Sequence, residues 1–265
     1  MLDSEAREVP VADQLTAVLE AGVPAVSFSF GDAAPYVDRV HDAGAAALVT
    51  VGSEEAAEAA VEAGADIVVA QGWEAGGHVR SEVATLPLVP RVADAVDVPV
   101  VAAGGIADGR GAAAVLAAGA DGAWLGPRFL ATEEAAIEDV YRQQVLEADE
   151  TDTLHSELLD VDWEGTPHRV LRNSTVEDWE ATGRPAPGEH PSEGETIASY
   201  PGGQPIERYG DDLPVKGAEG DLEALALYAG QSSGLTDEVR PAAAVLKELV
   251  AETEARIERL SSLVE

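Results

Sequence analysis

A short phrase that recurs along the first half of the chain constrains its fold more than any other feature. Each copy joins the end of an alanine-rich segment to a glycine and then to an apolar run, as in the residues around Gly64. Similar copies surround Gly22, Gly44 and Gly119, and the first three glycines are 22 and 20 residues apart. Such a phrase indicates a helix end, a glycine just past it and the start of a strand. Because this interval matches one strand plus one helix, the repeat predicts parallel strands joined by helices.

Five strands are predicted in this way, at residues 25–30, 46–51, 66–70, 99–103 and 122–125. Strands this apolar, alternating with helices, are typical of an α/β protein whose parallel sheet is covered by helices. The predicted fold is a (β/α)8 barrel of the TIM type that is incomplete, with about five strands visible and the first three missing. On this interpretation the chain starts, at Met1-Leu2-Asp3, near the crossover helix before the fourth strand of the barrel.

The predicted organisation has three parts. Residues 1–132 form the partial barrel, residues 133–215 an insertion or lid subdomain, and residues 216–265 the C-terminal helices that pack on the barrel. The insertion begins with a helix at 135–146, and its polar, Pro- and Gly-rich remainder is expected to be loops. Helices are expected at 222–228 and 240–263, the second with one apolar stripe made of Val245, Leu246, Leu249, Val250, Ile257 and Leu260.

The charge balance limits the partners of the chain. Fifty acidic residues against 16 basic ones give a formal charge of −34. This excess indicates a protein from a halophilic organism, because concentrated salt screens the repulsion between carboxylates. The alternative is an ordinary acidic protein. Nucleic acid and anionic membranes both need positive patches, so neither is expected as a partner. The absence of cysteine excludes disulfides and thiolate sites, and no signal peptide or long apolar run is found. We therefore expect a soluble, cytoplasmic protein.

The stretch from Val68 to His78 is the first candidate site. Its apolar strand runs into Gln71 and Gly72, and then into Gly76 and Gly77 just before His78. Glycine accepts positive φ angles and lets a ligand approach the backbone closely. The alternative is that the glycines only make a tight turn and that His78 is a structural residue.

Two later strands also end in glycine turns. Gly104 and Gly105 follow the fourth predicted strand and precede a helix that opens at Asp108 or Gly109, and Gly126 follows the fifth strand. Free backbone amides at such turns, with a helix dipole behind them, favour a phosphate. Two consecutive turns of this kind are typical of the phosphate site of a barrel. Each turn alone is equally compatible with a tight connection that binds nothing.

The stretches 70–78, 99–111 and 125–134 together resemble the nitronate monooxygenase family, formerly called 2-nitropropane dioxygenases. Residues 26–31 and the segment Tyr228–Leu235 resemble further segments of that family, so the likeness covers nearly the whole chain. The family also contains FMN-dependent enoyl reductases and NADH:quinone reductases.

The resemblance implies a barrel that holds FMN at the C-terminal ends of its strands. The cofactor-binding residues would be Gln71, Gly72, Gly76, Gly77, Gly104, Gly105, Gly126, Gln231 and Ser232, with the phosphate on Gly104, Gly105 and Gly126. His78 would be the catalytic base that takes a carbon-bound proton from a neutral nitroalkane, a task that suits imidazole near neutral pH. The implied reaction converts a nitronate and O2 into a carbonyl compound and nitrite, with flavin supplying the redox chemistry.

Three functional alternatives stay open: a nitronate monooxygenase, an NAD(P)H-dependent quinone or enoyl reductase, and a truncated chain that binds flavin phosphate without turnover. A homodimer is also left open. No metal is expected, because His168 and His190 lack partners at ligand spacing and are expected to be solvated. Trp163 and Trp179 are expected to pack inside the insertion.

The resemblance also generates a test at Pro127, where members of the family usually have a hydroxyl residue. Proline removes that hydroxyl and a backbone N–H, so we expect weaker FMN binding than in a Pro127→Thr variant. The measurement compares the flavin retained by the two proteins after identical gel filtration. Equal retention would contradict the prediction.

Overall fold

The five expected strands form one parallel sheet. They are β1 (Ala25–Phe28), β2 (Ala46–Val51), β3 (Ile67–Gln71), β5 (Val100–Ala103) and β6 (Gly122–Trp124). The strands pair in the order β1-β2-β3-β5-β6, so the strands of this sheet follow one another in chain order. The computed structural model describes residues 9–159, 163 and 165–263, and the expected start at Met1-Leu2-Asp3 lies outside them. The α/β class with a five-stranded parallel sheet is confirmed.

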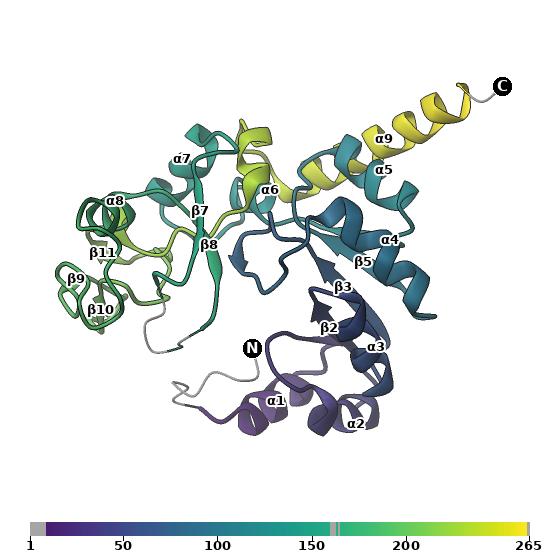
Figure 1. The fold of residues 1–265 in the computed structure, drawn as a ribbon, viewed down its shortest axis with the longest axis horizontal. Helices are drawn as coiled ribbons and strands as arrows, with labels where there is room; N and C mark the ends of the chain where they lie inside the picture. Colours follow the sequence, from purple (N-terminus) through teal and green to yellow (C-terminus); the bar gives the residue numbers. More distant parts are fainter. Residues whose placement is uncertain (1–8, 160–162, 164, 264–265) are drawn as a thin grey trace. The chain divides into compact units, whose positions relative to one another are not determined.

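Helices connect these strands. They are α1 (Val11–Glu20), α2 (Ala34–Asp42), α3 (Glu54–Glu62), α4 (Thr85–Ala95) and α5 (Gly109–Ala117). The Ser53 hydroxyl accepts a hydrogen bond from the Ala56 amide at the start of α3, as expected for an N-cap. Figure 1 shows α2, α3 and α4 along the same face of the sheet. Burial alternates along β2 in agreement with this covering, since Ala47, Val49 and Val51 are buried and the residues between them are half-buried.

In two copies of the repeated phrase, an aspartate carboxylate accepts a hydrogen bond from the neighbouring strand. In one copy the Asp66 Oδ2 accepts a hydrogen bond from the Ala47 amide at 2.7 Å, and in the other the Asp121 Oδ2 accepts one from the Val100 amide at 2.9 Å. The hydrogen bond from Ala47 lowers the pKa of Asp66, and His41 Nε2 at 2.9 Å acts in the same direction. Each carboxylate therefore ties the start of its own strand to the start of the neighbouring strand.

The chain divides into two compact units. The first contains the sheet and comprises the described residues up to 73 together with 81–104 and 112–124; the second comprises 74–80, 105–111 and the described residues from 125 onwards. In the second unit β4 (Gly77–His78), β8 (His168–Leu171) and β7 (Thr153–Ser156) form one antiparallel sheet. A second small sheet has the order β10 (Pro205–Glu207), β9 (Thr196–Ser199), β11 (Glu219–Gly220). The predicted three-part division stays a prediction.

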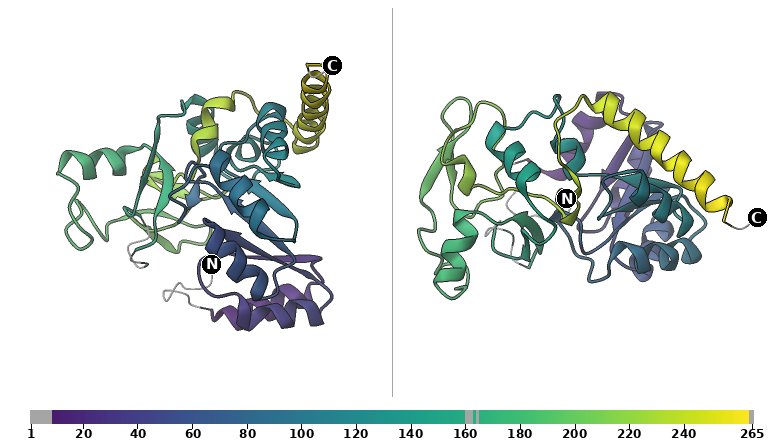
Figure 2. Two further views of the ribbon diagram at one scale, coloured as in Figure 1. Left: turned by 45° about the vertical axis from the view of Figure 1, so that its right-hand side comes forward. Right: turned by 90° about the horizontal axis from the view of Figure 1, so that it is seen from above.

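The helices of the second unit are α6 (Pro127–Leu130), α7 (Asp139–Glu147), α8 (Ser174–Ala181) and α9 (Ala242–Ser261), with 3-10 turns η1 (Leu222–Ala224) and η2 (Gln231–Leu235). Figure 2 shows α9 as one long helix. In the described parts of the chain, no helix is both long enough and apolar enough to cross a membrane.

Several expectations for this second unit were wrong. The helix expected at 135–146 begins only at Asp139, and the one expected at 222–228 is a single 3-10 turn. The expected loops of 147–213 contain β7 to β10 and α8, because backbone pairing with distant segments orders short strands that are too weak to read locally. Of the apolar stripe on α9, only Val245 is buried, whereas Leu246 is 54% exposed and Leu260 51% exposed.

The carboxylate of Asp66 gives a test of the sheet. The folded state lowers its pKa, so its stabilisation is present above the unfolded pKa near 3.9 and is lost as pH falls through the lower folded value. We expect Asp66→Ala to reduce the free energy of unfolding by about 1 kcal/mol at pH 7, a value discounted because the side chain is partly exposed. At pH 2 to 3 this difference should shrink.

Urea unfolding at the two pH values measures the effect. The matched control is Asp38→Ala, which removes an exposed carboxylate from α2. A loss of the same size in both variants at pH 7 would show that Asp66 contributes only through net charge.

Candidate active site

His78 lies on a two-residue strand that the sequence did not reveal. β4 pairs antiparallel with β8, so that Gly77 is opposite Arg169 and His78 is opposite His168, and β8 pairs in turn with β7. The next residue continues this pairing, because the Val79 amide donates to the Pro167 carbonyl at 2.8 Å. The backbone at His78 is therefore fixed by a sheet rather than left in a free turn.

The glycine turn before His78 packs against the segment that precedes η2. A Cβ added at Gly76 would lie 2.4 Å from the Gly230 nitrogen, and one at Gly230 would lie 2.7 Å from the Glu74 carbonyl oxygen. The Gln231 amide donates to the same Glu74 oxygen at 3.0 Å. Two predicted site segments, Gly76–Gly77 and Gln231–Ser232, are thus brought together, and Gly76 and Gly230 are required by backbone contact whether or not a ligand binds.

Among the described residues, three rings lie close to the imidazole of His78. The ring centroids of Trp163, Tyr228 and His168 lie 5.2, 5.3 and 5.7 Å from that of His78. The His168 ring meets it edge-on at 67°, while Trp163 and Tyr228 are tilted by about 41° and 42°. Such distances allow favourable aromatic contacts and, for a protonated imidazole, contact with π faces.

The expectation of solvated histidines in the insertion was wrong. His168 is fully buried and His190 is 6% exposed, with the His190 ring 4.6 Å from that of Tyr209. Trp163 lies beside His78, so its contacts extend beyond the insertion. Local sequence does not reveal the burial of His168, because β8 is covered by segments distant in sequence, among them β4 and the residues around Leu227.

Sequence reasoning also missed Arg169, the neighbour of His168 on β8. Its side chain is 2% exposed, and its Nη1 donates to the Thr153 hydroxyl at 3.0 Å. Burial lowers the pKa of Arg169, and the negative charge of Glu74 opposes this shift. Burial likewise lowers the pKa of His155, whose Nε2 donates to the Val79 carbonyl at 3.2 Å. The sequence around Arg169 carries no signal of its burial, because the residue stands between His168 and Val170 in a segment that also contains Arg172 and Asn173.

The remaining predicted residues lie at the strand ends. In the sheet unit, Gln71 ends β3, the Gly72 amide donates to the Ala103 carbonyl at 2.8 Å, and Gly104 (φ 113°) accepts a hydrogen bond from the Thr85 hydroxyl at 3.1 Å. In the second unit, Gly126 precedes Pro127, the first residue of α6. Proline is well tolerated there, since the first amide of a helix has no partner within it. The Ser232 side chain is buried.

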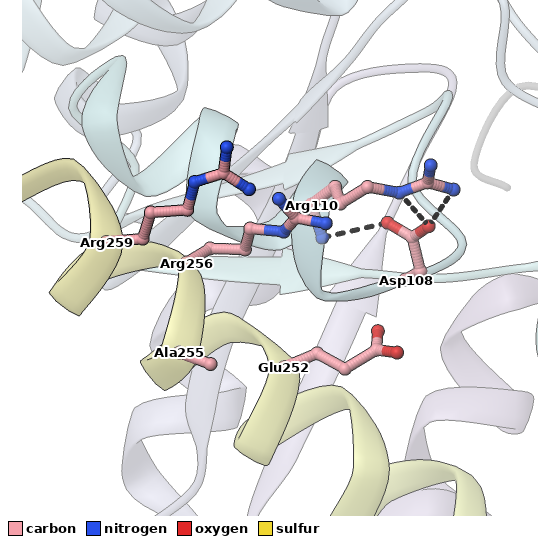
Figure 3. A pocket seen from close by; sticks show the side chains of 6 residues that line it. All are labelled: Asp108, Arg110, Glu252, Ala255, Arg256 and Arg259. Atoms are coloured by element: carbon pink, nitrogen blue, oxygen red, sulfur yellow. Dashed lines mark hydrogen bonds and ion pairs between the residues drawn. The ribbon is translucent and has the colours of Figure 1, made fainter.

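The start of α5 is already engaged by carboxylates. Glu252 of α9 accepts from the Gly109 amide at 3.0 Å, and Asp108 accepts from the amides of Arg110 and Gly111 at 2.8 and 3.1 Å. Asp108, Arg110 and Glu252 line a pocket of about 440 Å³ together with Arg256 and Arg259 of α9. Figure 3 shows these side chains. Since these amides are occupied, the phosphate prediction rests on Gly104, Gly105 and Gly126.

The glycines of the second unit allow a test of whether a phosphate-bearing cofactor fits. No atom lies within 4 Å of a Cβ built on Gly77 or Gly126, so the backbone there is open to a close approach. At Gly105 (φ 68°) the Glu74 carboxylate lies 3.1 Å from the Cβ position. The space beside Gly77 and Gly126 leaves room for an anionic group, whereas the Glu74 carboxylate occupies the space beside Gly105.

Comparison with known proteins gives consistent results. The family model described as nitronate monooxygenase matches residues 4–252. A Mycobacterium tuberculosis protein described as a monooxygenase is 37% identical over 230 residues, which cover 86% of this chain and 58% of that protein. The chain spans about half the length of other curated relatives.

Two solved structures are also similar. FabK from Thermotoga maritima has a TM-score of 0.80 at 32% identity, covering 97% of this chain and 76% of that one. Nitroalkane oxidase from Streptomyces ansochromogenes has a TM-score of 0.73 at 31% identity, covering 94% of this chain and 69% of that one. On the family match and these likenesses, the chain belongs to the nitronate monooxygenase family.

Proposed function

We propose that this chain is an FMN-dependent oxidoreductase that oxidises alkyl nitronates and nitroalkanes with O2 to a carbonyl compound and nitrite. The observation that carries the proposal is His78, which β4 holds beside three rings next to the glycine turn. The likeness to nitroalkane oxidase supports the choice of substrate class.

The residues proposed to hold FMN are the strand-end groups described above. The family resemblance implies Gln71, Gly72, Gly76, Gly77, Gly104, Gly105, Gly126, Gln231 and Ser232 for this role, and the second unit by itself holds Gly76, Gly77, Gly105, Gly126, Gln231 and Ser232. FMN, when bound, would supply the electron transfer that no side chain of the described residues can perform. We also propose that the sheet is part of a (β/α)8 barrel, since parallel strands in strict chain order with helices along one face are typical of that fold.

His78 is proposed to accept the proton from the carbon next to the nitro group. Loss of this proton converts a neutral nitroalkane into its nitronate, with the proton on the imidazole and the electron pair delocalised over carbon and the nitro oxygens. A substrate supplied as the nitronate has already lost the proton and does not need the base.

A second candidate function is an NAD(P)H-dependent quinone or enoyl reductase. The structural likeness to FabK at a TM-score of 0.80 favours it. Anaerobic titration of the flavin-loaded protein separates the candidates: bleaching by a nitronate supports the oxygenase, and bleaching by NADH supports the reductase. A protein that takes up flavin and is bleached by neither reagent would overturn both.

The base role of His78 gives a specific prediction. We expect His78→Asn to lower kcat for a neutral nitroalkane by about 100-fold or more, because asparagine cannot take up the proton. Oxidation of the pre-formed nitronate should continue at close to the wild-type rate. Oxygen consumption with both substrates measures this, and undiminished turnover of the neutral nitroalkane would exclude His78 as the base.

A further inference from the structure

His168 is the group that directly opposes His78 in the small antiparallel sheet. The two residues pair across β4 and β8, and the edge of the His168 ring meets the His78 ring at a centroid distance of 5.7 Å. His168 is fully buried, so its orientation is set by protein contacts rather than by water. Whatever fixes the His168 ring therefore limits where the His78 ring can lie.

Two backbone contacts fix that ring. The Leu159 amide donates to His168 Nε2 at 3.0 Å, so this nitrogen must carry a lone pair. His168 Nδ1 lies 3.2 Å from the Thr166 carbonyl oxygen, which can only accept, so Nδ1 carries the hydrogen. These partners select the neutral Nδ1–H tautomer, since a proton on Nε2 would break the bond from Leu159 and bury a charge.

A neutral ring at this position suits a proton acceptor at His78. A second cation in contact would oppose the positive charge that His78 gains with the proton, whereas neutral His168 does not. Tyr228 completes the arrangement: its ring lies 5.3 Å from His78 and, edge-on at 85°, 6.0 Å from His168. With Trp163 it offers π faces to a protonated imidazole.

Other titratable side chains lie near these two rings in the described part of the chain. Arg169 follows His168 on β8, and alternation along a strand turns its side chain to the opposite face, where it interacts with Glu74 and with His155 of β7. Tyr228 comes from the segment before η2, and Arg80 from the same turn as His78 is exposed. Alternation along β8 thus places the buried cation on the face of the sheet opposite the rings of His78 and His168.

We propose that His168 is a positioning residue for His78: a neutral imidazole, locked by Leu159 and Thr166, that holds the proton-accepting ring in place against Tyr228 and Trp163. The inference rests on the proposed function, in which the proton that His78 accepts comes from the substrate. The arrangement of the rings can be tested without flavin or substrate.

The first test is NMR of the 15N-labelled protein, whose five histidines can be assigned with His78→Asn and His168→Gln. We expect His168 to keep the Nδ1–H tautomer from pH 5.5 to 8.5. The ring resonances of His78 should move in His168→Leu but stay close to their wild-type positions in His168→Gln, whose amide can both accept from Leu159 and donate to Thr166. Protonation of His168 within this range, or unchanged His78 resonances in His168→Leu, would overturn the proposal.

The second test is kinetic and uses both substrate forms. His168→Leu should lower kcat about tenfold for a neutral nitroalkane, leave KM and nitronate oxidation near wild type, and be rescued by His168→Gln. His190→Gln, which alters a buried histidine beside Tyr209, is the matched control and should change neither rate. Equal losses on both substrates would overturn the positioning role. A wild type that oxidises neither form contradicts the proposed function, and the NMR result then decides the arrangement of the rings by itself.

Discussion

The geometry of the candidate site depends on the contact between the backbones of Gly76 and Gly230. No side chain fits between them, since a Cβ on Gly76 would lie 2.4 Å from the Gly230 nitrogen. This contact brings the turn that carries His78 against the segment that carries Tyr228, and the bond from Gln231 to the Glu74 carbonyl secures it. Any larger residue at Gly76 or Gly230 would separate these segments and with them the rings around His78.

Among the described residues, two arginines are buried in the second unit although the chain is strongly acidic. With 16 basic residues against 50 acidic ones, most arginines would be expected to pair with carboxylates at the surface. Arg169 is instead buried in the sheet that holds His78, and Arg128 is 8% exposed and donates to the Glu238 carbonyl at 3.0 Å. Both sit in the second unit, where they tie together segments that are far apart in sequence. Hydrogen bonds of buried arginines therefore accompany apolar packing in this unit.

The repeat made much of the sheet predictable. Its glycines end helices and its apolar runs become strands, so the five strands and their parallel order follow from local pattern. The aspartates of two copies even have equivalent bonds, from Ala47 to Asp66 and from Val100 to Asp121. Local pattern suffices here because each strand pairs with the next strand along the chain, which leaves little choice of partner.

The site could be predicted only as a set of residues. Sequence pattern identified His78, the glycine turns and the segment with Gln231, and the family resemblance assigned them to one FMN site. Sequence pattern could not identify His168, Arg169 or Trp163 as neighbours of His78 and its turn. The pairing of β4 with β8 brings them there, and it joins segments about 90 residues apart. The sequence by itself thus determined the parallel sheet and the family. Only the tertiary structure decided which rings surround His78, because the long-range pairing of β4 with β8 brings them together.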